Sequence, residues 1–361
     1  MRHLLESRLV NDPFGDPALY VDFRDERRAL LFDLGNIDTL PPRKLLRLSH
    51  VFVSHTHMDH FAGFDHLLRV VLGRKERIVL TGGPGFIDRV GHKLAAYTWN
   101  VVHRYDVPLV IEAREALPGG GGRRAEFSSL ARFERSNDAP WPRHGDVLLA
   151  EENFRVRARF LDHDIVVLAF ALEEAMHVNV WKNRLAGMGL TTGPWLREAR
   201  RAILAGAPDD TPIDIRWNDH RGKHGEVRPL GELRAAFECV PGTRIGYVTD
   251  MRCTDANLAA LDGLLADVDL LFIESVFLHA DVAHAERKNH LTARQAGEIA
   301  RRVRAKAVVP FHFSPRYLQR AADVAAEVHA AWSGPSALPD TTGGTAEDRS
   351  EPPGAWTRAM L

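Results

Sequence analysis

Cysteine is scarce in this sequence, and net charge is almost absent. Cys239 and Cys253 are the two cysteines among 361 residues, which excludes a disulfide framework, and their spacing does not match a zinc finger. The formal net charge of −1 gives the molecule as a whole no attraction for nucleic acid or for an anionic membrane. Binding to either polyanion therefore needs a local basic patch.

Long apolar runs are also missing. No stretch is long enough to span a bilayer, and residues 1–6 lack the apolar core of a signal peptide. With the low cysteine content, these absences predict a soluble, cytoplasmic protein without a membrane partner. The Gly-rich turn at residues 82–85 lacks the Lys-Ser/Thr pair of a P-loop, so it is interpreted as a tight turn rather than a nucleotide site.

Histidine, by contrast, is concentrated in one stretch, and the chain is organised around it. Residues 54–60 read Ser-His-Thr-His-Met-Asp-His. An apolar run at residues 51–53 predicts a buried strand before this stretch, and the apolar spacing of residues 64–71 predicts a packed helix after it. The loop between a strand and the next helix is where open α/β sheets place their ligand sites.

The side chains of this loop are of the kinds that bind metals. Alternation along the loop aims His55 and His57 at one point, and Asp59 and His60 at another. Neutral imidazole and carboxylate suit borderline divalent ions, above all zinc. A solvated, His-rich turn is the simpler alternative, but four ligand-type side chains at this spacing favour a metal site.

Further ligand types stand at the ends of predicted strands. Asp33 lies near the end of a strand predicted at residues 29–35, where its position alone predicts a turn former. It also resembles the strand-Asp-x-Gly element of the metallo-β-lactamase fold, and that resemblance implies that it supports the histidine loop. His163 separates two predicted strands at residues 154–160 and 165–172. Other candidates at strand ends or before a capped helix are Asp250, Glu274, His290 and His312.

Residues 173–244 break the strand–helix rhythm and carry positive charge. Pro194 and Gly206 predict the start and the end of a helix. The basic residues on this helix and shortly before it are Lys182, Arg184, Arg197, Arg200 and Arg201. Charge alone predicts a solvated helix face. On an insertion from a hydrolase core, the same residues could bind phosphates with an affinity that falls with salt.

The histidine loop resembles the signature of the metallo-β-lactamase-fold hydrolases, and the other motifs resemble the ribonuclease Z family of tRNA 3′-processing endonucleases. The loop alone identifies only the superfamily, whereas its combination with the later motifs is far more specific. The resemblance covers most of residues 19–331. Its elements are residues 55–60, His163, Gly193-Pro194, Asp250, Glu274-Ser275-Val276-Phe277, His290-Leu291-Thr292 and His312-Phe313-Ser314-Pro315-Arg316-Tyr317.

The resemblance implies an α/β fold, the four-layer αββα metallo-β-lactamase-like sandwich with an inserted substrate-binding arm. Residues 1–331 are expected to form the hydrolase domain, with residues 173–244 as the insertion and candidate tRNA-binding arm. Residues 332–361 have the composition of a disordered tail. The chain lacks the family's usual opening strand with its Gly-Thr-Gly turn, and residues 165–171 replace a Ser-x-Gly-Tyr run. These departures concern the substrate more than the metal chemistry.

The resemblance further implies a centre with two zinc ions per chain, or manganese in their place. The implied ligands are His55, His57 and His163 for one ion, Asp59, His60 and His312 for the other, and Asp250 as the bridge. Asp59 would also orient the attacking water, while His290, held by Glu274, would protonate the leaving oxygen. Arg252 or Arg316 would stabilise the transition-state charge, or would form structural ion pairs.

The implied reaction cleaves precursor tRNA into a tRNA with a free 3′-OH and a 5′-phosphorylated trailer. The family also implies a homodimer. One alternative is a metal-dependent phosphodiesterase that acts on small or cyclic nucleotide diesters at the same centre. A second is a metal-free binding protein that has kept the fold, which the complete ligand set disfavours because a decayed site usually loses a member.

Overall fold

The computed structural model describes residues 5–24, 26–219 and 222–334. Within them the chain forms two compact units. The first unit comprises residues up to 150, residues 156–172 and residues from 244 onward, and the second comprises residues 151–155 and 173–243. Of the predicted disordered tail, residues 332–361, all but the first three positions lie outside the described residues.

The first unit contains an eight-stranded sheet whose strands follow one another in chain order. Strands β3 to β6 are parallel, and the pairs on either side of them are antiparallel. The strands are β1 Leu5–Leu9, β2 Leu19–Phe23, β3 Ala29–Phe32, β4 Leu48–Phe52, β5 Arg77–Gly82, β6 Val110–Ala116, β7 Gly122–Ser128 and β8 Arg135–Pro140. Because β3 and β4 are parallel, Asp33 and Ser54 come to the same edge of the sheet.

The second sheet of this unit has six strands in the order β18-β17-β16-β11-β10-β9. The strands are β9 Val147–Ala150, β10 Phe154–Asp162, β11 Val166–Glu174, β16 Arg244–Val248, β17 Leu270–Glu274 and β18 Val308–Phe311. Strands β16, β17 and β18 run parallel. Their carboxyl ends therefore bring Asp250, Glu274 and His312 to one edge.

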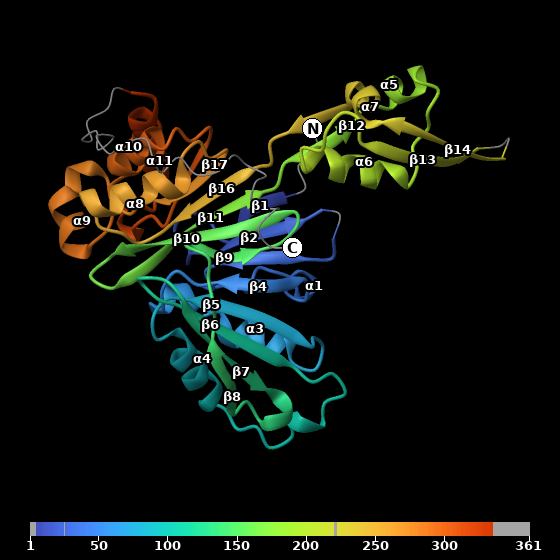
Figure 1. Ribbon diagram of the computed structural model, residues 1–361. Helices are drawn as coiled ribbons and strands as arrows, with labels where there is room; N and C mark the ends of the chain where they lie inside the picture. Colours follow the sequence, from blue (N-terminus) through green and yellow to red (C-terminus); the bar gives the residue numbers. More distant parts are fainter. Residues whose placement is uncertain (1–4, 25, 220–221, 335–361) are drawn as a thin grey trace. The chain divides into compact units, whose positions relative to one another are not determined.

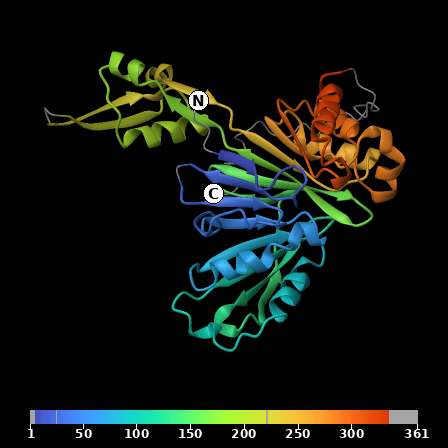
Figure 2. The ribbon, with the colours of Figure 1, turned by 180° about the vertical axis from the view of Figure 1, so that it is seen from behind.

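The two sheets pack face to face through aromatic side chains. The ring centre of Phe170 on β11 lies 5.4 Å from that of Phe32 and 6.0 Å from that of Phe52. Helices cover the outer faces (Figures 1 and 2). They are α3 Phe64–Val71 and α4 Phe86–Ala95 on the first sheet, and α8 Asp255–Leu265, α10 Ala293–Arg302 and α11 Ala321–Ser333 on the second. The predicted four-layer αββα sandwich is confirmed.

Shorter helices complete the first unit. They are α1 Pro42–Leu45, α2 Met58–Phe61 and α9 Val282–Lys288, with 3-10 turns at η1 Val102–Arg104, η2 Ser129–Ala131, η4 His279–Asp281 and η5 Pro315–Tyr317. Every helix in the described residues is too short or too polar to cross a membrane.

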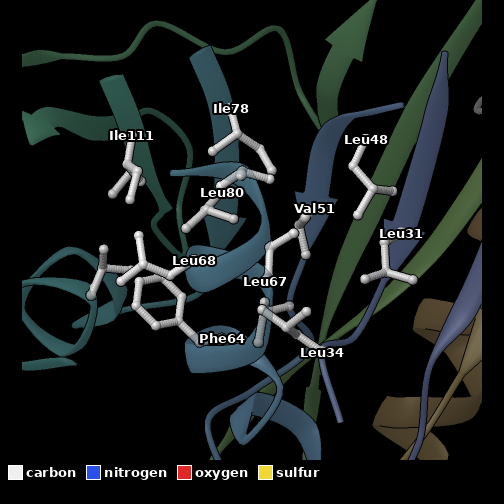
Figure 3. Packing of buried hydrophobic residues seen from close by; sticks show 14 of the residues in the cluster. Leu31, Leu34, Leu48, Val51, Phe64, Leu67, Leu68, Ile78, Leu80 and Ile111 are labelled. Carbon is white, nitrogen blue, oxygen red and sulfur yellow. The ribbon is translucent and has the colours of Figure 1, made fainter. Parts of the chain in front are cut away.

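Helix α3 fixes the chain that follows the histidine loop. Phe64, Leu67 and Leu68 follow the spacing of one helix face, and all three are buried. Figure 3 shows them in one cluster with side chains of the sheet, among them Leu80 and Val51. Burying each such side chain contributes about 1.5–3 kcal/mol. The packing therefore holds this end of the loop in place.

The same end of the loop also depends on a close backbone approach. A Cβ atom at Gly63 would lie 2.1 Å from the carbonyl oxygen of Gly35, so only glycine fits there. The Gly63 amide donates to the carbonyl of Leu34 at 2.9 Å, and the Leu34 amide donates to that of His60 at 2.9 Å. These bonds tie the end of the loop to the chain after β3.

The chain has an opening strand, contrary to the expectation from the sequence. β1 pairs antiparallel with β2, with Leu5 opposite Phe23. It is an edge strand of which only Leu5 is fully buried. Its mostly polar residues therefore give too weak an alternation to predict a strand.

The second unit has its own small core. Its strands are β12 His177–Val180 paired with β15 Phe237–Val240, and β13 Pro212–Asp219 paired with β14 Gly222–Pro229. Its helices are α5 Lys182–Gly187, α6 Trp195–Leu204, α7 Leu230–Leu233 and the 3-10 turn η3 Arg234–Ala236. Helix α6 starts after Pro194, and Gly206 beyond its end has a φ of 64°, as the sequence predicts. Trp195 and Ile203 of α6 pack with Ile213 of β13.

Candidate metal centre

Asp33 holds both ends of the histidine loop through contacts to Ser54 and His60. One carboxylate oxygen accepts the Ser54 amide at 2.6 Å, and the other accepts the Ser54 hydroxyl at 2.9 Å. The second oxygen also lies 2.9 Å from His60 Nδ1 and accepts the Tyr247 hydroxyl at 3.0 Å. Because the carboxylate can only accept, His60 Nδ1 carries the proton and Nε2 is left as the ligand atom. These contacts give Asp33 the supporting role predicted from the sequence.

Asp250 is the point on which the predicted ligands converge. Its Oδ2 lies 3.5 Å from Nε2 of His55, 3.5 Å from Nε2 of His60 and 3.5 Å from Nε2 of His163. Its Oδ1 lies 3.0 Å from Nδ1 of His312 and accepts the Thr249 hydroxyl at 2.9 Å. The carboxylate is 2% exposed, so imidazoles rather than water surround it.

The first predicted ligand set fits a divalent ion. The ligand atoms of its members all lie within 4.8 Å of one another; the members are His55, His57, His163 and Asp250. A tetrahedral ion that binds nitrogen or oxygen at about 2.1 Å separates its ligands by about 3.4 Å. The 3.5 Å distances to Asp250 match that separation.

The second predicted set also comes together. Asp59, His60 and His312 place their ligand atoms within 4.8 Å of one another. Asp59 Oδ2 lies 3.4 Å from His60 Nε2 and 3.2 Å from His312 Nε2. Among the described residues, the buried Nε2 atoms of His55 and His60 have no hydrogen-bond partner. Such atoms are costly to bury alone, and a cation among them removes that cost.

The buried carboxylates of the cluster favour positive charge on the groups around them. Burial opposes the charged form of His312, but Asp250 outweighs it and raises the pKa of His312 to about 10. The charges of Asp250 and Asp33 likewise raise the pKa of His60 against burial. For His55 the charge of Asp250 does not outweigh burial. Burial, which has the larger effect, and the charge of His60 lower the pKa of His55 to about 2. A divalent ion would supply the same positive charge in place of protons.

Three residues of the centre have strained backbones. Asp33, Asp250 and His312 have φ values of 59°, 30° and 59°. Non-glycine residues rarely adopt such values, and they cluster at functional sites, where the surrounding structure fixes them. Here each of the three follows a parallel strand whose carboxyl end faces the centre.

His163 is oriented by a contact that the sequence did not predict. Its Nδ1 lies 2.8 Å from the carbonyl oxygen of Asn289, so this nitrogen carries the proton and Nε2 faces Asp250. Asn289 ends helix α9 in the left-handed conformation, with a φ of 62°. Asparagine is common at such ends, so its sequence signal indicates a helix end and not a contact to a ligand.

His290 and Glu274 form the pair predicted from the sequence. Glu274 is fully buried, and its Oε2 lies 2.8 Å from His290 Nδ1. Its other oxygen accepts the amides of Met251 at 2.8 Å and Leu291 at 3.3 Å. Burial opposes protonation of His290, but the charge and hydrogen bond of Glu274 outweigh it and raise the pKa of His290. The ring lies 4.9 Å from that of His163.

The two arginines predicted near the reaction are occupied by protein groups. Arg252 donates to Asn289 Oδ1 at 2.8 Å, to Asp162 at 3.1 Å and to Asp164 at 3.0 Å. Of the two predicted roles for Arg252, the geometry favours the structural ion pair.

Arg316 lies over the ring of Phe277 at 5.2 Å, with one nitrogen 3.6 Å from Asp281. The Arg316 side chain remains 40% exposed, so part of it stays accessible to a substrate. The basic residues predicted to bind substrate on the insertion belong to the second unit, where they are exposed on α5 and α6; they are Lys182, Arg184, Arg197, Arg200 and Arg201.

The fold is shared with solved structures. The metallo-β-lactamase fold protein YhfI from Bacillus subtilis matches with a TM-score of 0.52 and 13% identity over 91% of this chain and 93% of its own. Yeast PDE1 matches with a TM-score of 0.50 and 8% identity over 92% of this chain and 96% of its own. Fold and site together define a divalent-metal hydrolase of the metallo-β-lactamase fold.

Sequence relatives narrow the class. Ribonuclease Z of Deinococcus radiodurans is 34% identical over 321 residues, which cover 87% of this chain and 91% of the relative. Ribonuclease Z of Enterococcus faecalis is 26% identical over 82% of this chain and 81% of its own. No family model matches the chain. The chain belongs to the ribonuclease Z family, and the family, fold and enzyme class predicted from the sequence are confirmed.

Proposed function

We propose that this chain is a dinuclear-zinc phosphodiesterase that cleaves the 3′ trailer from precursor tRNA. The supporting observation is the convergence of two ligand sets on Asp250, beside the His290–Glu274 pair, in a chain of the ribonuclease Z family. Carboxylates and imidazoles without cysteine suit zinc, with manganese as the other candidate.

The proposed ligands fall into two groups around a shared carboxylate. They are His55, His57 and His163 for one ion, Asp59, His60 and His312 for the other, and Asp250 between them. Two such ions would supply a Lewis acid for the phosphate and would acidify the attacking water.

Asp59 is proposed to receive the proton of the attacking water. Its side chain is 40% exposed, so substrate and solvent can reach it, whereas Asp250 beside it is buried. Hydrogen bonds from His312 and His60 outweigh the effect of burial and hold the pKa of Asp59 below its ordinary value. The carboxylate is therefore ionised at neutral pH and can accept that proton.

His290 is proposed to donate the proton that the leaving group needs. Its side chain is 17% exposed, and Glu274 favours its protonated form. In the reaction, the water oxygen forms a bond to phosphorus as the bond from phosphorus to the 3′ oxygen breaks. His290 then protonates that oxygen, which leaves a 3′-OH on the tRNA and a phosphate on the 5′ end of the trailer.

The second unit is proposed to bind the RNA. Its residues 173–243 overlap the insertion predicted at residues 173–244, and the five basic side chains predicted there are exposed. Cations in this arrangement bind phosphates by releasing counterions, without reading sequence.

A homodimer is also proposed, because the resemblance to the ribonuclease Z family implies one. Light scattering at several protein concentrations tests it.

The experiment that tests this function is cleavage of a precursor tRNA labelled in its 3′ trailer, beside bis(p-nitrophenyl) phosphate as a small diester. The proposal predicts one cut at the start of the trailer, with a 3′-OH and a 5′-phosphate at the new ends. Cleavage of the small diester alone would overturn the tRNA assignment in favour of a small-diester phosphodiesterase. A protein that retains no divalent metal and cuts neither substrate would contradict both.

A further inference from the structure

We propose that Asn257 is a positioning residue that sets His163 against Asp250. Asn257 lies in the first turn of α8 and is 3% exposed. It belongs to neither ligand set. The proposal rests on the proposed dinuclear site and adds a residue on which the geometry of that site depends.

The amide of Asn257 joins the two stretches of chain that carry these ligands. Its Oδ1 accepts the backbone amide of Asp162 at 2.9 Å. Its Nδ2 donates to the carbonyl of Asp162 at 2.9 Å and to that of Arg252 at 2.8 Å. Asp162 immediately precedes His163, and Arg252 follows Asp250 by two positions. One buried side chain therefore fixes the backbone next to both ligands.

The helix itself gives no reason for asparagine at this position. In α10, the N-cap Thr292 accepts the amide of Gln295, and the Gln295 side chain accepts the Thr292 amide at 2.9 Å, which completes a capping box. In α8, the N-cap Thr254 accepts the Asn257 amide at 3.3 Å, but the Asn257 side chain leaves the helix. Asparagine is also a weaker helix former than glutamine. Its contacts outside the helix therefore account for its presence.

Arg252 completes the support of the turn that carries His163. Its guanidinium binds Asp162 and Asp164, which flank His163, and also the side chain of Asn289, whose carbonyl orients the His163 ring. These ion pairs are exposed, with Arg252 at 37% and Asp162 at 50%. Exposed pairs are individually weak, so the buried amide of Asn257 is the stronger restraint.

Loss of this restraint acts mainly on one of the two ions. The first ligand set contains both His163 and Asp250, next to which Asn257 holds the backbone, whereas the second set shares only Asp250. Removing a residue that orients a metal ligand typically weakens metal affinity by about 10- to 100-fold. We therefore expect the larger loss of affinity at the first set.

The test compares zinc binding by Asn257→Ala, Asn257→Asp and wild type, by competition with a chromogenic chelator. Asn257→Asp keeps the acceptor for the Asp162 amide but loses both donations. Ser129→Ala is the matched control, because Ser129 is 1% exposed and its hydroxyl accepts the Leu109 amide at 2.9 Å beside the ends of β6 and β7, in the other sheet's part of the unit. Thermal unfolding of each variant measures the cost to the fold.

We expect Asn257→Ala to bind one of its two zinc ions about 10- to 100-fold more weakly, and the other with a smaller loss of affinity. Asn257→Asp should fall between, and Ser129→Ala should lower the melting temperature without changing zinc affinity. Equal zinc affinity in Asn257→Ala and wild type would overturn the proposal, as would a loss no larger than in Ser129→Ala.

Arg252→Ala keeps the proposal falsifiable if the Asn257 variants do not fold, because it removes the exposed part of the same support. Arg252→Ala should lower the affinity for the same zinc ion by a smaller factor than Asn257→Ala does. Unchanged zinc affinity with a raised KM for precursor tRNA would instead make Arg252 a substrate contact. Zinc binding needs no RNA, so a wild type that binds two zinc ions but leaves precursor tRNA intact would contradict the proposed function and not this inference.

Discussion

The metal centre of the first unit and the basic residues of the second unit use charge in opposite ways. Asp250 is 2% exposed and lies 3.5 Å from each of three imidazole nitrogens. On α6 of the second unit, Arg197, Arg200 and Arg201 are exposed. Charge in the first region is buried and held in place, whereas in the second it is solvated.

The difference indicates which step each region serves. Buried, oriented charges act strongly over short distances and need no rearrangement during a reaction, which suits bond cleavage. Solvated charges are screened beyond about 8–10 Å and act by displacing counterions, which suits binding of a polyanion. Substitutions in the first region should therefore change turnover and metal content, and those in the second should change affinity and its salt dependence.

The largest effect is expected from Asp250→Ala. It removes the carboxylate that both ligand sets surround, so zinc content and turnover should fall together, with at least about 10³-fold loss of kcat. Elemental analysis and cleavage of bis(p-nitrophenyl) phosphate measure the two quantities. A variant that keeps both zinc ions and its activity would show that Asp250 is not the bridge.

His290→Ala should separate proton donation from metal binding. Loss of a general acid costs about 10²–10⁴-fold in rate. We expect a loss in this range for precursor tRNA, whose 3′ oxygen is a poor leaving group, and a much smaller loss for bis(p-nitrophenyl) phosphate, which needs no proton to leave. Zinc content should stay at the wild-type value. Equal losses on the two substrates would contradict the assignment of His290 as the acid.

Asp33→Asn tests whether support from outside the ligand sets matters. The amide cannot accept all four of the hydrogen bonds that Asp33 now takes from Ser54, His60 and Tyr247. Zinc affinity should fall by about 10- to 100-fold, as is usual for partners of metal ligands. Chelator competition measures it, and an unchanged affinity would restrict the role of Asp33 to folding.

Replacing Arg197, Arg200 and Arg201 together with alanine should leave the chemistry intact. If all three contact phosphates, the slope of log affinity for precursor tRNA against log salt should become shallower by about 2–3. The kcat for bis(p-nitrophenyl) phosphate should not change. Arg304→Ala, at an exposed ion pair with Asp267, is the control for loss of surface charge. An unchanged slope would show that these three arginines of α6 do not contact the RNA.

The smallest effect concerns Asp146, a partly buried carboxylate outside the metal centre. Burial disfavours ionisation of Asp146, but hydrogen bonds and charge from Arg157 outweigh it and lower the pKa of Asp146. A lowered pKa stabilises the fold above the unfolded value of about 3.9 and loses that effect as pH falls through the folded value. Asp146→Asn should therefore reduce the unfolding free energy by roughly 1–3 kcal/mol at pH 7.

Urea unfolding of metal-free Asp146→Asn and wild type from pH 7 down to about pH 3 measures this effect. The difference between the two proteins should shrink as the pH drops below the unfolded pKa of an aspartate. A difference that stays constant over this range would mean that Asp146 does not act through its charge.

The sequence predicts those residues of the centre that lie close to one another along the chain, and not those that are far apart in it. His55 to His60 lie within one loop, so residue types and spacing alone indicate a metal site. His163 and His312 needed the family resemblance, since a single histidine at a strand end carries no sign of its partners. The fold class followed from the same resemblance, and the polar edge strand β1 was missed.

The supporting residues could not be predicted in this way. Asn257 contacts a residue 95 positions earlier, and the Asn289 carbonyl contacts one 126 positions earlier. Neither contact leaves a pattern in the nearby sequence. Asn257 looks like an ordinary residue of a helix start, and a backbone carbonyl is present at every position whatever the side chain. Such contacts become visible only when the parallel strands bring their carboxyl ends to one edge.

The most direct test of the central claim is anomalous scattering at the zinc edge from crystals of the zinc-loaded protein. The account predicts two peaks, one among His55, His57 and His163 and one among Asp59, His60 and His312, each within bonding distance of Asp250. A single peak, or peaks away from Asp250, would contradict a dinuclear centre built on that carboxylate.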